Sequence, residues 1–68
     1  MSKTLEEIRN MPHDNWASKA SCAKMREASS IFCDSSRSFE HRLEACHIFA
    51  DVTGTSIERL KREYLEKS

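Results

Sequence analysis

Glycine and proline are almost absent from this sequence, with one of each among 68 residues. These two residues, Gly54 and Pro12, are therefore the only ones whose own backbone chemistry strongly turns or breaks regular structure. β-Branched residues are few, and no stretch alternates apolar and polar side chains with the period of two that strands show. These absences favour an all-α fold.

The chain also lacks a net charge, because eleven basic residues are matched by eleven acidic residues. It has no overall field to draw it towards phosphate backbones or anionic lipid, so nucleic-acid binding would need a local patch. The longest apolar runs are three or four residues, too short to span a membrane, and residues 1–4 do not open a secretory signal. We therefore expect a cytoplasmic protein without a membrane partner.

The length of the chain predicts one helical domain over residues 1–68. A chain of this size buries only about 60% of its unfolded surface, so its own core stabilises it weakly. We expect a small bundle of three to four helices. A homodimer or a tight complex would cover apolar side chains that so few helices cannot cover for one another.

Four helices are expected from capping residues and apolar spacing. Thr4 and Glu7 have the spacing of a capping box, and Pro12 stops the helix that follows, over residues 5–10. Asp14 or Asn15 is the expected N-cap of a second helix, over residues 16–33. A polar loop over 34–38 leads to a third and most apolar helix over 39–52, and the fourth is expected over 56–66, with a second capping box between Thr55 and Glu58.

The second predicted helix has two different faces. Its apolar stripe runs from Trp16 through Ala20 and Ala23 towards Phe32, and such small residues permit close helix approach. The opposite face is expected to be solvated and carries Lys19, Lys24, Arg26 and Glu27.

Gly54 joins the third and fourth helices, flanked by Ala50, Ser56, Leu60 and Tyr64. This spacing resembles the helix-turn-helix of many bacterial regulators, in which a small residue lets two helices cross closely and a glycine turns the chain. The resemblance covers residues 49–64. It implies a helix-turn-helix-like C-terminal hairpin and a duplex DNA site at the start of the last helix, formed by Ser56, Arg59, Lys61 and Arg62 in a dimer that reads two half-sites.

The charges on that last helix indicate a different surface. At about 100° per residue, Ile57, Leu60 and Tyr64 share one face. The other face mixes three acids with two bases, namely Glu58, Arg59, Arg62, Glu63 and Glu66. Such a face is typical of a solvated helix with charge pairs at four-residue spacing.

The cysteines and histidines do not form a catalytic or metal-binding motif. Cys22, Cys33 and Cys46 are expected to be free thiols, because three cysteines cannot all pair within one chain. A metal site using Cys33, His41, Cys46 and His47 is disfavoured, because the last two are adjacent and point about 100° apart on a helix. Cys33 and His41 also lack an orienting third group for nucleophilic catalysis. We therefore predict a non-enzyme without a cofactor or metal.

The sequence thus predicts a protein-binding module, acting as an inhibitor, an adaptor or a small subunit. The expected partly exposed anchors are Trp16, Phe32, Ile57 and Leu65. In length and composition the chain resembles the small accessory proteins of phages and mobile elements. The alternative prediction is a DNA-binding regulator that uses the cations near Gly54.

Overall fold

The computed structural model describes residues 3–66, and every regular element within this range is helical. Four α-helices follow one another along the chain: α1 (Leu5–Arg9), α2 (Lys19–Phe32), α3 (Phe39–Thr53) and α4 (Ile57–Leu60). A short π-helix, η1 (Lys61–Leu65), continues directly from α4. The predicted all-α helical bundle is confirmed.

Hydroxyl side chains begin the first three helices. The Thr4 hydroxyl accepts from the Glu7 amide (3.2 Å), and the Glu7 carboxylate accepts from the Thr4 amide (2.8 Å), so the predicted capping box is present. The bonds with Thr4 hold the pKa of the Glu7 carboxyl below its usual value. The hydroxyls of Ser18 and Ser38 accept from the amides three residues further on, at 3.0 and 3.2 Å.

The predicted start of the second helix was wrong. The sequence indicated a helix from Trp16 capped by Asp14 or Asn15, whereas α2 begins after Ser18. The side-chain oxygen of Asn15 instead accepts from the Ala17 amide at 2.9 Å, which turns the chain before the helix starts. Trp16 therefore lies on the loop between α1 and α2.

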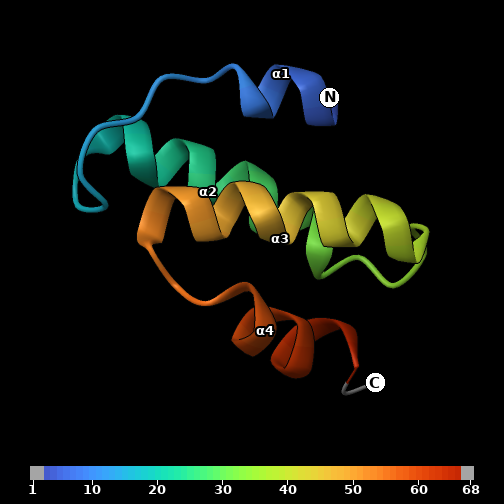
Figure 1. Ribbon diagram of the computed structural model, residues 1–68. Coiled ribbons are helices and arrows are strands. Elements are labelled where there is room, and N and C mark those ends of the chain that lie inside the picture. The colour runs from blue at the N-terminus through green and yellow to red at the C-terminus, as the bar shows by residue number, and fades with distance from the viewer. Residues whose placement is uncertain (1–2, 67–68) are drawn as a thin grey trace.

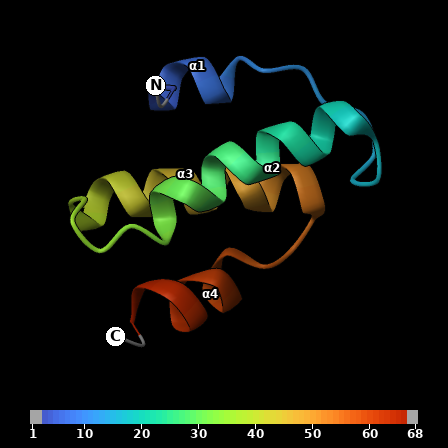
Figure 2. The same ribbon diagram turned by 180° about the vertical axis from the view of Figure 1, so that it is seen from behind.

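The helices form a flattened body with α2 and α3 at its centre. These two helices run antiparallel, with α1 along one side and α4 with η1 along the other (Figure 1). The view from behind has the same order, with the α1–α2 loop at one edge (Figure 2). The Cα extents of 30 × 27 × 13 Å agree with this flat arrangement, which leaves the core thin.

Phe32, the last residue of α2, is the largest side chain of the core. Its ring meets Phe49 of α3 edge-on at a centroid distance of 5.3 Å and Tyr64 of η1 at 4.9 Å, so it joins three elements. The buried cluster around it consists of Ile8, Ala28, Ile31, Phe32, Ala45, Cys46, Ile48, Leu60 and Leu65.

A basic side chain of α3 connects the ends of two other helices. Arg42 Nε donates to the carbonyl oxygen of Phe32 (2.9 Å), and its Nη2 donates to that of Tyr64 (2.8 Å). Both carbonyls lie near helix C-termini, where backbone oxygens have no intrahelical partner. Arg42 therefore holds α2 and η1 together through their unpaired ends.

The C-terminal helix differs from the α-helix predicted over 56–66. After Leu60 the pattern changes to a π-turn, in which the Glu66 amide donates to the Lys61 carbonyl at 2.8 Å. Bonds from residue i to i+5 change the angular spacing of side chains relative to an α-helix. Leu65, which was expected to be partly exposed, is consequently buried in the core.

Gly54 makes the predicted sharp turn after α3. Its φ is 75°, and its amide donates to the Ala50 carbonyl at 2.7 Å, which gives the left-handed C-cap that glycine favours. The second predicted capping box, between Thr55 and Glu58, was wrong. Ser56 is the N-cap of α4, and the Thr55 hydroxyl accepts from the Thr53 hydroxyl at 2.8 Å.

Replacing Gly54 should destabilise the protein only through the left-handed backbone conformation at this position. A Cβ at this position would meet nothing within 4 Å. We expect Gly54→Ala to lower the free energy of unfolding by about 1 kcal/mol, and Gly54→Asn by less, because asparagine tolerates this backbone region. Urea unfolding followed by circular dichroism measures both. Equal stability of the three proteins would contradict a left-handed cap.

Candidate interaction surface

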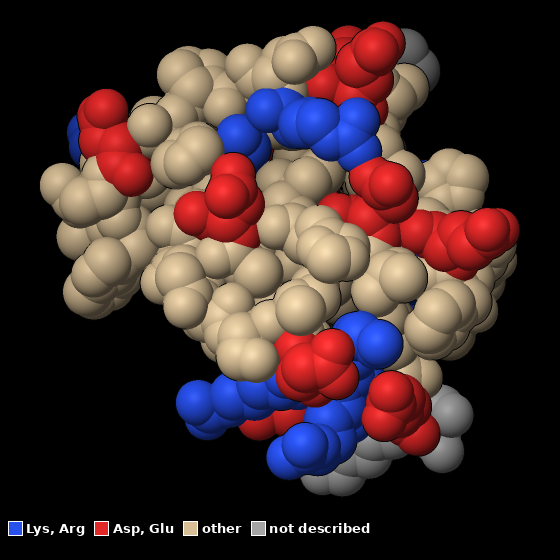
Figure 3. Space-filling model, in the orientation of Figure 1, with Lys and Arg blue, Asp and Glu red and all other residues tan. Residues whose placement is uncertain are grey.

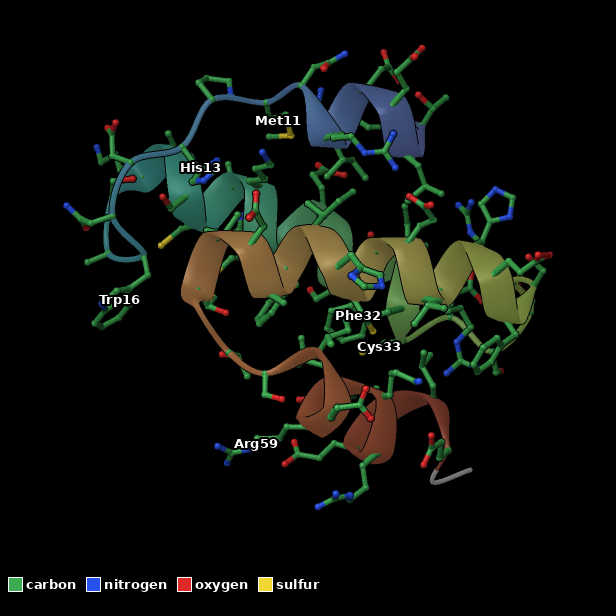
Figure 4. The ribbon with its side chains drawn as sticks, in the orientation of Figure 1. Met11, His13, Trp16, Phe32, Cys33 and Arg59 are labelled. Carbon is green, nitrogen blue, oxygen red and sulfur yellow. The ribbon has the colours of Figure 1, made fainter. Side chains whose placement is uncertain are left out.

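Trp16 is the most exposed of the large apolar side chains that the structure describes. It lies on the loop between α1 and α2, and 66% of its surface is open to solvent. Figure 4 shows the indole pointing away from the helices. The predicted exposure of this side chain is confirmed, although it comes from a loop and not from the start of a helix.

Hydrogen bonds order the loop on both sides of this indole. The Asp14 amide donates to the Ser21 hydroxyl at 3.2 Å, and Ser21 is fully buried. The Asn15 side chain accepts from Ala17 (2.9 Å), and its carbonyl accepts from the Ser18 amide (3.1 Å). The loop is therefore a short hydrogen-bonded turn attached to the first turn of α2.

Lys24 of α2 fixes the other end of this loop. Only 4% of Lys24 is exposed, and its Nζ donates to the carbonyls of Arg9 (3.1 Å) and Met11 (2.9 Å). The same Nζ lies 3.1 Å from His13 Nδ1. Met11 and His13 lie over α2 in Figure 4. The expected solvated position of Lys24 was wrong, because α1 and the following loop cover it.

A signal for this burial is present in the sequence. The buried residues of α2 are Ser21, Lys24, Ala28, Ile31 and Phe32, which recur at helical intervals of three and four. Sequence reasoning missed the stripe because two of its members are polar. It placed the stripe through Ala20 and Ala23 instead, and Ala23 is exposed.

The other predicted protein-binding anchors do not join Trp16 in one patch. Phe32 is only 2% exposed and Leu65 only 7%, so the expected partial exposure of both was wrong. Phe32 is enclosed by two other aromatic rings, and Leu65 is turned inward by η1. Ile57 is half-buried against the core. Trp16 is the only strongly exposed anchor of the four.

The residues implied for DNA contact lie together on α4 and η1. Ser56 is an exposed N-cap, Lys61 is half-buried and Arg62 is exposed. Arg59 Nε donates to the Glu63 carboxylate at 3.3 Å, which partly neutralises it. In Figure 3 Lys and Arg side chains gather over α4, and acidic side chains lie among them.

A shallow hollow of about 290 Å³ lies between α1 and α3. Arg9, Glu44, His47, Ile48 and Asp51 line it, and the Arg9 guanidinium is paired with the Glu44 carboxylate. Its wall therefore carries both signs of charge. Among residues 3–66, no group of three or more His, Cys, Asp and Glu side chains is arranged to hold a metal ion.

The three cysteines are free thiols in different environments. Cys22 and Cys33 are exposed, whereas Cys46 is buried in α3. Burial raises the pKa of the Cys46 thiol to about 11, because a thiolate there would lose its hydration. Cys46 therefore acts as a small apolar core residue at neutral pH.

No protein-family model matches the chain, and comparisons with curated proteins and with solved structures find no match. Across the described range, each helix is too short or too polar to cross a bilayer.

The environment of Cys46 predicts selective alkylation. With its pKa raised from 9.0 to about 11, the thiolate fraction near pH 8 is roughly a hundredfold lower than for an unshifted thiol, and burial also blocks access. We expect brief iodoacetamide treatment of the native protein to modify Cys22 and Cys33 but not Cys46. Peptide mass spectrometry locates the adducts, and denatured protein is the control. Early modification of Cys46 would contradict its buried position.

Proposed function

We propose that this protein is a helical module that binds another protein, as an inhibitor, an adaptor or a small subunit, with Trp16 as its main anchor. The observation that carries this proposal is the 66% exposure of Trp16 on an ordered loop. Tryptophan is among the residues most enriched at the energetic centres of protein interfaces. Its large apolar surface gains binding energy when a partner's pocket removes it from water.

The order of the loop supports this role. Asn15 accepts two backbone hydrogen bonds that close the turn around Trp16, and the Asp14 amide is bound to Ser21. An anchor that is already held in place loses little conformational freedom on binding. Trp16 is therefore presented as a pre-organised contact.

The charges support a protein partner more than duplex DNA. The formal net charge is zero, and Arg59, one of the four residues of the DNA prediction, is paired with Glu63. Acidic side chains lie among the cations of α4 in Figure 3. Affinity for duplex DNA depends on several cations that contact phosphates without nearby repulsion. The DNA-binding regulator remains the alternative prediction.

Affinity capture from extracts of the native host tests the proposal. We expect the wild-type protein to retain one stoichiometric protein and Trp16→Ala to lose it. Loss of an interface anchor costs about 2 kcal/mol, roughly a thirtyfold weaker Kd, which a titration with the purified partner measures.

Phe39→Ala is the matched control. Phe39 is 51% exposed and begins α3 at the end of the molecule opposite the loop that carries Trp16 (Figure 1). It should retain the partner. Circular dichroism checks that both variants fold. Capture of nucleic acid alone, or equal retention by Trp16→Ala and wild type, would contradict the proposal.

A further inference from the structure

Lys24 Nζ has three polar neighbours, and none of them is a carboxylate. The neighbours are the carbonyls of Arg9 and Met11 and the Nδ1 atom of His13, at 2.9 to 3.1 Å. The ion pairs among residues 3–66 involve other cations. A lysine that is only 4% exposed normally has a partner of opposite charge. Here neutral groups take that place.

The donors and acceptors around Lys24 Nζ can all be paired only if Lys24 and His13 together carry no more than one positive charge. An ammonium group has three N–H donors and no acceptor, so two donate to the carbonyls and the third needs an unprotonated His13 Nδ1. If the proton is on Nδ1 instead, Nζ must be a neutral amine that accepts it. In both arrangements the pair can carry one positive charge and no more. A second proton would place two cations 3.1 Å apart.

We propose that His13 and Lys24 form a proton-controlled latch on the loop that carries Trp16. When Nδ1 takes a proton from water, the imidazolium and the ammonium repel each other. His13 is the member that leaves, because it is half-buried on a loop, whereas Lys24 belongs to α2 and keeps its two carbonyls. Departure of His13 removes one of the contacts that tie the loop to α2, and the loop after Met11 gains motion although its other hydrogen bonds remain. The latch is closed while Nδ1 is unprotonated and accepts from Lys24 Nζ, and it opens when a proton occupies Nδ1.

Other charged groups on the packed elements do not hydrogen-bond to either member of the pair. Arg9 on α1 pairs with Glu44 on α3, and the backbone amide of Asp14 donates to the Ser21 hydroxyl. Glu27 follows Lys24 by three residues on α2, and His47 and Asp51 of α3 line the hollow beside Arg9. The repulsion between His13 and Lys24 is therefore not replaced by an ion pair.

Trp16 reports on the latch directly, because it is the only tryptophan in the chain. Time-resolved fluorescence anisotropy measures its local motion independently of changes in intensity. We expect the fast component of the decay to gain amplitude as the pH of the solution is lowered from about 8 to about 5. The helical signal in circular dichroism should persist, which separates loop opening from global unfolding.

His13→Asn is the decisive variant, because its amide oxygen can accept from Lys24 and does not titrate. The fluorescence anisotropy decay of this variant should be the same at the high and the low end of that pH range. His41→Asn is the matched control, since His41 Nδ1 also has one close partner, the Ser38 hydroxyl at 3.1 Å. This control should respond to pH as the wild type does. A flat wild-type profile, or the wild-type response in His13→Asn, would overturn the latch.

Nuclear magnetic resonance of the wild-type protein gives a second test that needs no variant. The amide signals of Met11 and of residues 13–17 should shift with the same midpoint as the His13 ring signals. Loop signals that follow His41 or His47 instead would overturn the proposal. These readouts need no binding partner, so the latch and the proposed function can fail separately.

Discussion

Two basic side chains hold this fold together by donating hydrogen bonds to backbone carbonyls near the C-terminal ends of other helices. Backbone carbonyls at the end of a helix have no partner within that helix. Lys24 of α2 donates to the last carbonyl of α1, and Arg42 of α3 donates to the last carbonyl of α2 and to one in η1. Two cations thus connect α1, α2, α3 and η1. Charge-assisted bonds of this kind are stronger than bonds between neutral groups.

The small size of the chain explains why such bonds are important here. The flat body has a thin core centred on Phe32, and a chain of this length buries a modest share of its surface. Bonds to charged groups contribute about 1.5 to 3 kcal/mol each, a large fraction of the stability of a small domain. The loop between α1 and α2 depends on the same chemistry, because Lys24 also binds the Met11 carbonyl. Stability and the presentation of Trp16 therefore depend on one buried amine.

Local sequence chemistry predicted the features that are decided within a few residues. The Thr4 capping box, the polar loop before α3 and the Gly54 turn all follow from neighbouring residues. The burial of Lys24 could not be read in this way, because its carbonyl partners lie 13 and 15 residues away. Leu65 was misplaced because a helical wheel assumes constant rotation, which η1 breaks. Of the candidate site, the exposed Trp16 was predicted but its position on a loop was not.

Residue-resolved amide hydrogen exchange of Lys24→Met tests whether the hydrogen bonds of this buried amine hold α1 against α2. Methionine fills the space of the lysine stem but donates no hydrogen bond, which leaves two carbonyls without their partner at a cost of about 1 to 3 kcal/mol each. We expect the amides of α1, such as that of Ile8, to lose protection from exchange, while those of Ala45 and Cys46 in α3 keep it. Unchanged protection of α1 in this variant would contradict the account.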